Sequence, residues 1–148
     1  MKPIVHRLVA VLLALGLCVY SLQASAAEKS FAETKVVLQI SDNDPFKQTL
    51  VLNVANNLIK HYGPDQVDIE IVAFGPGLRL LFVENVNADR IQSLVDNGVR
   101  FAACNNTVLG MSKILGEEPK LNNNAVRVSA GVVRIMDLNK QGYQLIKP

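Results

Sequence analysis

Short apolar runs alternate with amphipathic stretches along most of the chain. The apolar runs are rich in β-branched residues and end at turn residues, which is typical of buried strands. We therefore expect strands at 35–41, 67–74, 99–103, 126–130 and 143–147. Between them, apolar residues recur at helical spacing, and we expect helices at 45–62, 88–97, 105–115 and 132–140. This alternation predicts a three-layer α/β/α domain with a mostly parallel sheet of about five strands.

The first helix carries clear signals at both ends. Asp44 is expected to cap its N-terminus and Pro45 to occupy its first position, while Gly63 and Pro64 end it. Its apolar stripe is expected to face the sheet, and Gln48 is expected on the opposite, polar face. The stripe consists of Phe46, Leu50, Val51, Val54, Ala55, Leu58 and Ile59.

Residues 78–86 are mostly apolar and have no clear period. They contain more large apolar side chains than one face of a short helix can bury. A monomer rarely exposes a large apolar patch, so the excess predicts contact with another copy of the chain, a homo-oligomer.

The N-terminus has the three parts of a secretory signal peptide. Lys2 and Arg7 form a basic head, residues 8–20 are apolar, and Ala24 and Ala26 form an Ala-x-Ala site. Cleavage after Ala26 fits best, with cleavage after Ala27 as the second choice. The apolar run is shorter than the roughly 20 residues that a membrane anchor needs.

A lipoprotein signal is the other alternative at this terminus. Its acylated cysteine would follow a small residue, whereas Cys18 follows Leu17. We therefore expect a periplasmic protein in which residues 1–26 are removed and residues 27–148 form a single domain.

Charge narrows the range of partners. The whole chain carries 15 basic and 13 acidic residues, and loss of Lys2 and Arg7 leaves equal numbers. A protein that binds nucleic acid or an anionic membrane would usually show a basic excess, so we expect neither partner for the mature form.

Motifs for common chemistries are absent from the sequence. It has no Walker loop, metal-binding spacing or nucleophile elbow, so we expect no cofactor and no metal. His61 falls in the last turn of the first predicted helix, where a favourable helix-end charge is more common than a catalytic base. The sequence leaves open whether the protein is an enzyme.

Cys104 is the one cysteine that remains after removal of the signal peptide. It follows a predicted strand and precedes a predicted helix, at the sheet edge where ligands and catalytic groups gather in α/β proteins. Helix N–H groups there would favour a partly exposed thiolate with a pKa below about 8.5. A small buried side chain with no chemical role is equally compatible with this position. Arg79 and Arg100 are nearby cations for which solvated roles are expected.

Four segments of the mature chain resemble the DsrE family of small α/β proteins associated with sulfur handling. The segments are 37–41, 72–77, 99–107 and 130–143, and the resemblance covers nearly the whole mature chain. It implies a three-layer α/β/α fold and an oligomer. In members that relay sulfur, a cysteine carries the sulfur as a persulfide, a role that maps only onto Cys104.

Two functions of different classes follow. The first is a periplasmic sulfur carrier that holds a persulfide on Cys104 and exchanges it with a thiol or persulfide partner protein. The second is a non-catalytic, oligomeric module that binds a small ligand or a protein at the same sheet edge. A thiol–disulfide oxidoreductase is a weaker third option because the chain has no Cys-x-x-Cys pair.

Overall fold

The computed structural model describes residue 29 and residues 31–148. The predicted signal peptide and its cleavage site lie outside the described residues. The strands are β1 (Thr34–Ile40), β2 (Val67–Ala73), β3 (Arg100–Cys104), β4 (Ala125–Val128) and β5 (Gln144–Ile146). The helices are α2 (Pro45–Tyr62), the 3-10 helix η1 (Gly75–Leu81), α3 (Ala88–Asp96), α4 (Asn105–Leu115) and α5 (Gly131–Lys140).

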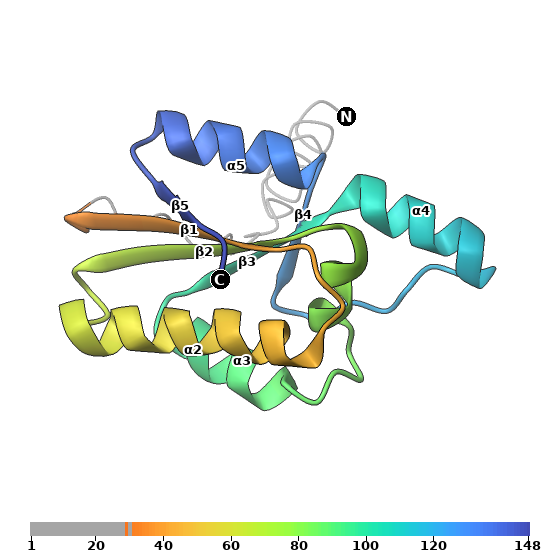
Figure 1. The fold of residues 1–148 in the computed structure, drawn as a ribbon, viewed down its shortest axis with the longest axis horizontal. Helices are drawn as coiled ribbons and strands as arrows, with labels where there is room; N and C mark the ends of the chain where they lie inside the picture. Colours follow the sequence, from red (N-terminus) through yellow and green to blue (C-terminus); the bar gives the residue numbers. More distant parts are fainter. Residues whose placement is uncertain (1–28, 30) are drawn as a thin grey trace, which may run out of the picture.

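All five strands run parallel in one sheet, in the order β4-β3-β2-β1-β5. Helices α2 and α3 cover one face of the sheet and α5 covers the other (Figure 1). The predicted three-layer α/β/α fold with a five-stranded sheet is therefore confirmed. None of the described helices has both the length and the apolar character needed to cross a bilayer.

Alternation along the strands divides the core between the two faces of the sheet. In β2, Ile69 and Ile71 pack in the larger cluster beneath α2 and α3, whereas Val72 packs against α5 with Ile135 and Leu138. The α5 face has the smaller apolar core, and β2 also places Asp68 and Glu70 on it. The α5 face therefore holds two buried carboxylates beside its apolar core.

Helix α2 begins as predicted, because the Asp44 carboxylate accepts a 2.8 Å hydrogen bond from the Phe46 backbone N–H. The prediction for its faces is wrong at three residues. Phe46 and Leu50 are exposed, and Gln48 is buried with 5% of its surface accessible. Gln48 is turned toward the loop after η1, where Asn85 Nδ2 donates a 3.2 Å hydrogen bond to Gln48 Oε1.

Residues 78–86 differ from the expectation that their apolar side chains meet another subunit. η1 lies across the carboxyl ends of the strands, and Leu78, Leu80 and Leu81 are completely buried in the chain's own core. Only Val83 and Val86, beyond η1, are exposed in the way the prediction required. The excess that suggested self-association is therefore absorbed within one chain, and self-association itself stays a prediction.

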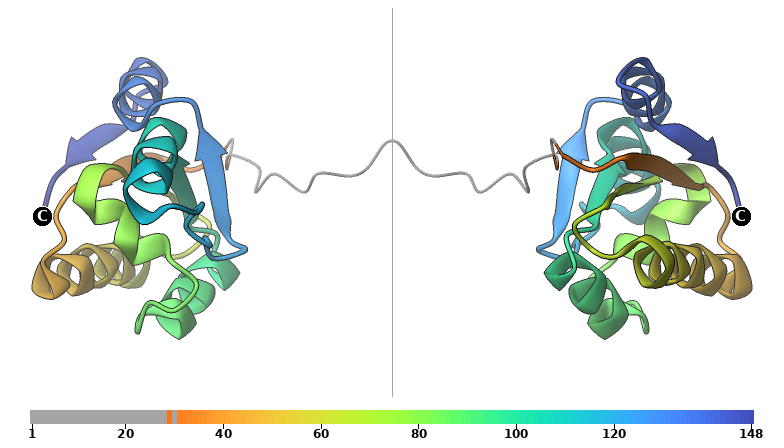
Figure 2. Two further views of the ribbon diagram at one scale, coloured as in Figure 1. Left: turned by 90° about the vertical axis from the view of Figure 1, so that its right-hand side faces the viewer. Right: turned by 90° about the vertical axis from the view of Figure 1, so that its left-hand side faces the viewer.

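η1 and α4 both lie beyond the carboxyl ends of the strands, in the region where an α/β sheet usually binds ligands (Figures 1 and 2). The left view of Figure 2 faces this end of the sheet and shows β4 and β5 at opposite edges. The candidate site is built there.

Candidate functional site

Cys104 ends β3 and is the N-cap residue of α4. It is in register with Val128, the last residue of the neighbouring strand β4, and α5 begins three residues later at Gly131. Two adjacent parallel strands therefore deliver two helix N-termini to the same point. Each helix N-terminus has unpaired N–H groups and a partial positive charge, so both favour an anion there.

The surroundings of the Cys104 sulfur favour its thiolate form. Burial alone would raise the pKa of the thiol, but a hydrogen bond with the Thr107 hydroxyl and nearby backbone N–H groups act against it. Their combined result is a pKa below the usual thiol value. The backbone groups belong to Gly131, Thr107 and Asn106. None of them forms a short capping bond to the sulfur, so the stabilisation comes from several longer contacts.

Cys104 is buried, with 5% of its surface accessible, so the expectation that it is partly exposed is wrong. Gly131 packs directly on Phe74. A side-chain carbon at Gly131 would lie 2.9 Å from a ring carbon of Phe74. The glycine therefore lets the first turn of α5 approach the end of the sheet, where its backbone N–H lies near the sulfur.

Thr107 links the thiol to the loop after β2. Its hydroxyl oxygen accepts a 2.9 Å hydrogen bond from the Gly75 backbone N–H. That contact uses an oxygen lone pair, so the single hydroxyl proton remains available for Cys104. The loop after β2 thus fixes the donor that faces the sulfur.

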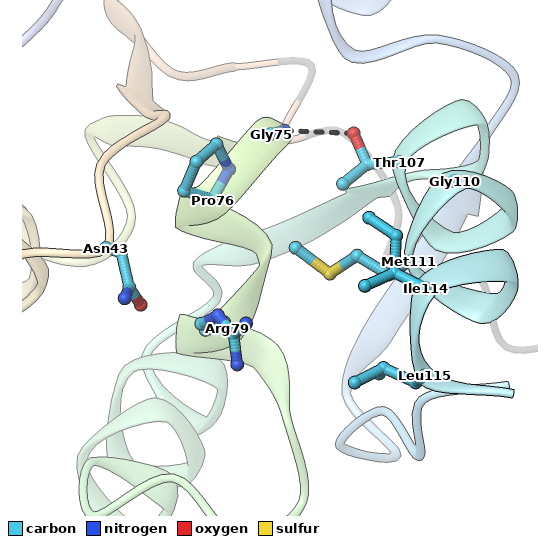
Figure 3. A pocket seen from close by; sticks show the side chains of 9 residues that line it. All are labelled: Asn43, Gly75, Pro76, Arg79, Thr107, Gly110, Met111, Ile114 and Leu115. Atoms are coloured by element: carbon cyan, nitrogen blue, oxygen red, sulfur yellow. Dashed lines mark hydrogen bonds between the residues drawn. The ribbon is translucent and has the colours of Figure 1, made fainter. Parts of the chain in front are cut away.

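A groove of about 640 Å³ opens beside Thr107, between η1 and α4 (Figure 3). The α4 wall is one helical face, because its lining residues follow the spacing of successive turns. These residues are Thr107, Gly110, Met111, Ile114 and Leu115. The opposite wall is formed by Gly75, Pro76 and Arg79, with Asn43 from the loop before α2. The groove leads along α4 to the residue that contacts the thiol.

A second, more polar cavity of about 420 Å³ lies on the other side of Arg79. Arg79 and Asn43 line both cavities. The polar cavity is also lined by Gln48, Asn85, Asn87 and Glu84 among its polar residues. The two cavities therefore share the exposed residue Arg79 as part of their walls.

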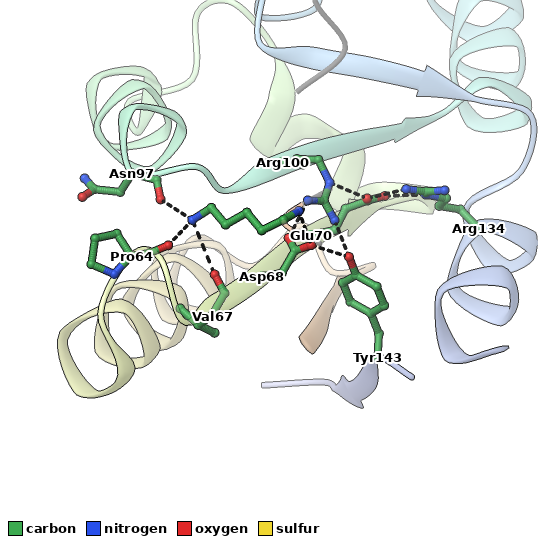
Figure 4. A network of polar contacts seen from close by, with 9 residues as sticks. Pro64, Val67, Asp68, Glu70, Asn97, Arg100, Arg134 and Tyr143 are labelled. Carbon is green, nitrogen blue, oxygen red and sulfur yellow. Dashed lines mark hydrogen bonds and ion pairs between the residues drawn. The ribbon is translucent and has the colours of Figure 1, made fainter. Parts of the chain in front are cut away.

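Arg100 is not part of this site, and the expectation of a solvated role for it is wrong. It lies at the opposite end of β3 and is 8% exposed, within a buried polar network on the α5 face (Figure 4). Its guanidinium contacts Asp68 Oδ1 at 2.5 Å and Glu70 Oε2 at 3.1 Å. Arg134 binds both carboxylate oxygens of Glu70 at 2.7 Å.

Tyr143 completes the network just before β5. Its hydroxyl donates a 2.6 Å hydrogen bond to Asp68 Oδ2 and accepts a 2.9 Å hydrogen bond from Arg100 Nη2. Burial and the contact with Asp68 raise the pKa of Tyr143 above its ordinary value, so the phenol stays protonated and keeps donating. Two carboxylates thus balance two guanidiniums within the network.

Metal-binding chemistry has no support in the part of the chain that the structure describes. No group of three or more His, Cys, Asp or Glu side chains gathers there in a way that could hold an ion. Within the same residues Cys104 is a free cysteine, so no disulfide competes for its sulfur.

Sequence reasoning identified Cys104 but missed Thr107 and Gly131 as its neighbours. Thr107 lies within the first turn of the helix that Cys104 caps, where a hydroxyl can reach back toward the cap. Gly131 comes from the next strand–helix unit, and its proximity depends on the pairing of β3 with β4. That pairing was not predicted.

We expect Thr107→Val to slow alkylation of Cys104 by iodoacetamide at neutral pH by roughly ten-fold, the loss expected for one hydrogen bond to a charged group. The variant keeps the side-chain shape but removes the donor, so the pKa of the thiol rises. The pH profile of thiolate ultraviolet absorbance should move to higher pH. Thr107→Ser restores the hydroxyl and should restore the profile. An unchanged profile in Thr107→Val would show that the hydroxyl does not stabilise the thiolate.

No family model matches the chain, and no curated protein matches it. The fold is similar to the protein of unknown function MTH1491 from Methanobacterium thermoautotrophicum, at 28% identity and a TM-score of 0.70. That similarity covers 78% of this chain and all of the other. The conserved protein of unknown function BT1422 from Bacteroides thetaiotaomicron is similar in fold alone, at 14% identity and a TM-score of 0.53. It covers 80% of this chain and 98% of the other.

Proposed function

We propose that this chain is a periplasmic carrier of sulfane sulfur, with Cys104 as the residue that bears the sulfur. The observation that carries the proposal is the convergence of the α4 and α5 N-termini and the Thr107 hydroxyl on one thiol, with a net lowering of its pKa. The thiolate is the nucleophilic form of cysteine, and these groups raise its share at neutral pH. The DsrE resemblance and the N-terminal signal pattern support the same proposal.

The transfer needs no oxidant or reductant. The Cys104 thiolate attacks the terminal sulfur of a donor persulfide, R–S–SH, forming a new S–S bond while the donor's S–S bond breaks. The donor leaves as R–S⁻, and Cys104 becomes the persulfide Cys–S–SH. An acceptor thiolate then attacks the outer sulfur, and Cys104 leaves as a thiolate. The same donors stabilise Cys104 as a leaving group in the second step.

Burial limits which donors can react. With 5% of Cys104 accessible, a small or linear polysulfide can reach the sulfur more easily than a bulky disulfide. We infer that a protein partner would exchange sulfur only after the groups that bury Cys104 move.

Sulfur loading of the mature chain tests the proposal. After incubation with inorganic polysulfide, the wild type should gain the mass of one or more sulfur atoms on Cys104, and cyanide should release that sulfur as thiocyanate. Cys104→Ser should gain none while keeping the circular dichroism spectrum of the wild type. Equal loading of both proteins, or none of the wild type, would contradict the proposal.

A second candidate function is binding of a small ligand without chemistry at the thiol. The groove between η1 and α4 favours it, because a mostly apolar concave surface with a few polar groups is typical of ligand sites. Self-association is proposed in either case, whereas a thiol or persulfide partner protein belongs to the sulfur carrier alone.

A further inference from the structure

The apolar face of α4 is only partly used by the core. Val108, in the first turn, is completely buried, whereas Ile114 is 84% exposed and Leu115 is 48% exposed. These two residues face the groove, and Met111 lines it while also packing against the core (Figure 3). From Thr107 to Leu115 the helix rises about 12 Å, which matches a medium-length hydrocarbon chain. The groove therefore offers an elongated apolar wall with no covering segment among the described residues.

Arg79 provides a charge at the side of this groove. Its side chain is exposed. Within the described residues, its guanidinium carbon lies 5.9 Å from the centroid of the Phe82 ring and its side chain forms no hydrogen bond. No described carboxylate forms an ion pair with it. An unpaired guanidinium that lines two cavities is suited to bind a carboxylate through two parallel hydrogen bonds.

Gln48 is a second, independent donor in the polar cavity. It is 5% exposed, and its Oε1 is occupied by Asn85 Nδ2 at 3.2 Å. Its Nε2 has no hydrogen-bond partner among the described residues, although it is not sealed from the cavity that Gln48 lines. Asn85 Nδ2 also bonds the backbone oxygen of Arg79 at 2.9 Å, so the two donor residues are held together. An amide N–H that opens into a cavity and has no partner among the described residues can donate to an acceptor supplied by a ligand.

Charge also bears on the kind of anion. Glu84 lines the same polar cavity and would repel an anion in proportion to its charge. A singly charged carboxylate is therefore repelled less than a group with two negative charges, and it meets two donors.

We propose that the two cavities that share Arg79 bind an amphipathic monocarboxylate, with its carboxylate at Arg79 and Gln48 and its apolar chain along Met111 and Ile114. This inference rests on the second candidate function, ligand binding, and does not depend on sulfur chemistry at Cys104. The proposed ligand has one anionic head and one medium-length apolar chain.

Titration with octanoate tests this proposal. Binding is measured by calorimetry and by the changes in the nuclear magnetic resonance shifts of the α4 amides. Octanoate should bind, and octanol, which lacks the charge, should bind at least ten-fold more weakly. Arg79→Gln should weaken octanoate binding by ten-fold or more, and Ile114→Asp should weaken it as strongly. Lys113→Gln removes an exposed charge from the same helix, outside the groove, and should leave binding unchanged.

The outcomes distinguish this inference from ligand binding in general and from sulfur transfer at Cys104. Equal binding of octanol and octanoate would overturn the carboxylate site while leaving a ligand groove. If neither octanoate nor octanol binds, both the carboxylate site and the ligand groove are overturned. Cys104→Ser should bind octanoate as the wild type does, and a loss of binding there would overturn the placement of the ligand along α4. Arg79 and Ile114 are exposed, so their variants should fold normally.

Discussion

Replacing Arg100 with methionine should lower the free energy of unfolding by about 3–5 kcal/mol, the usual cost of removing one partner from a buried ion pair. Arg100 contacts Asp68, which is completely buried, and Glu70, which is 2% exposed. Methionine fills a similar volume but leaves Asp68 without its main cation. Asp68 then keeps only neutral donors, from Tyr143 and the backbone N–H of Lys29.

Chemical denaturation measures this effect, and two comparisons define its origin. Arg127→Met removes an arginine from the exposed pair with Glu118 and should change stability little, because water screens such a pair. Adding Asp68→Asn to Arg100→Met should recover part of the loss, since the unpaired charge is then gone. If Arg100→Met unfolds no more easily than Arg127→Met, the network does not stabilise the fold.

Gly77→Ala should destabilise the domain by about 3 kcal/mol, at the upper end of the usual cost of overpacking. A side-chain carbon at Gly77 would lie 2.5 Å from the Ile40 backbone oxygen and 2.8 Å from the Ser41 Cα. Both neighbours are main chain at the end of a central strand, so neither can move without disturbing the sheet. Only glycine lets η1 lie this close to the end of β1.

Gly110→Ala is the matched control for Gly77→Ala. A side-chain carbon at Gly110 meets nothing within 4 Å, and alanine favours a helix interior by about 1 kcal/mol over glycine. The thermal midpoint should therefore rise slightly in Gly110→Ala and fall by several degrees in Gly77→Ala. A similar midpoint for the two variants would contradict the close packing of η1 on β1.

The sequence was sufficient to predict the fold because the decisive signals are local. Asp44 and Pro45 mark the start of α2, and Gly63 marks its end, so the element follows from a few adjacent residues. The same holds for α4, whose predicted range 105–115 agrees with the structure. Strands separated by such helices can form little other than a parallel sheet.

Features that depend on distant pairing could not be predicted. Gln48 has the polarity of a surface residue, and only the position of Asn85 explains why it is buried. Asp68 and Arg100 are 32 residues apart, so their contact follows from the pairing of β2 with β3 and not from a local pattern. The candidate site shows the same limit, because the position of Cys104 is local whereas Gly131 reaches it from another strand–helix unit.

The groups around the Cys104 sulfur are mostly main-chain amides, contributed by residues from two helices. An amide N–H is present whatever the side chain, so alanine scanning across α4 and α5 would leave most of this environment intact. Such a scan would detect Cys104, Thr107 and Gly131, where a side-chain carbon would press on Phe74, and would overlook the other amides. Homologous chains could therefore keep the same anion-stabilising shell while their sequences around it diverge, provided that β3 and β4 stay in register and the start of α5 stays small.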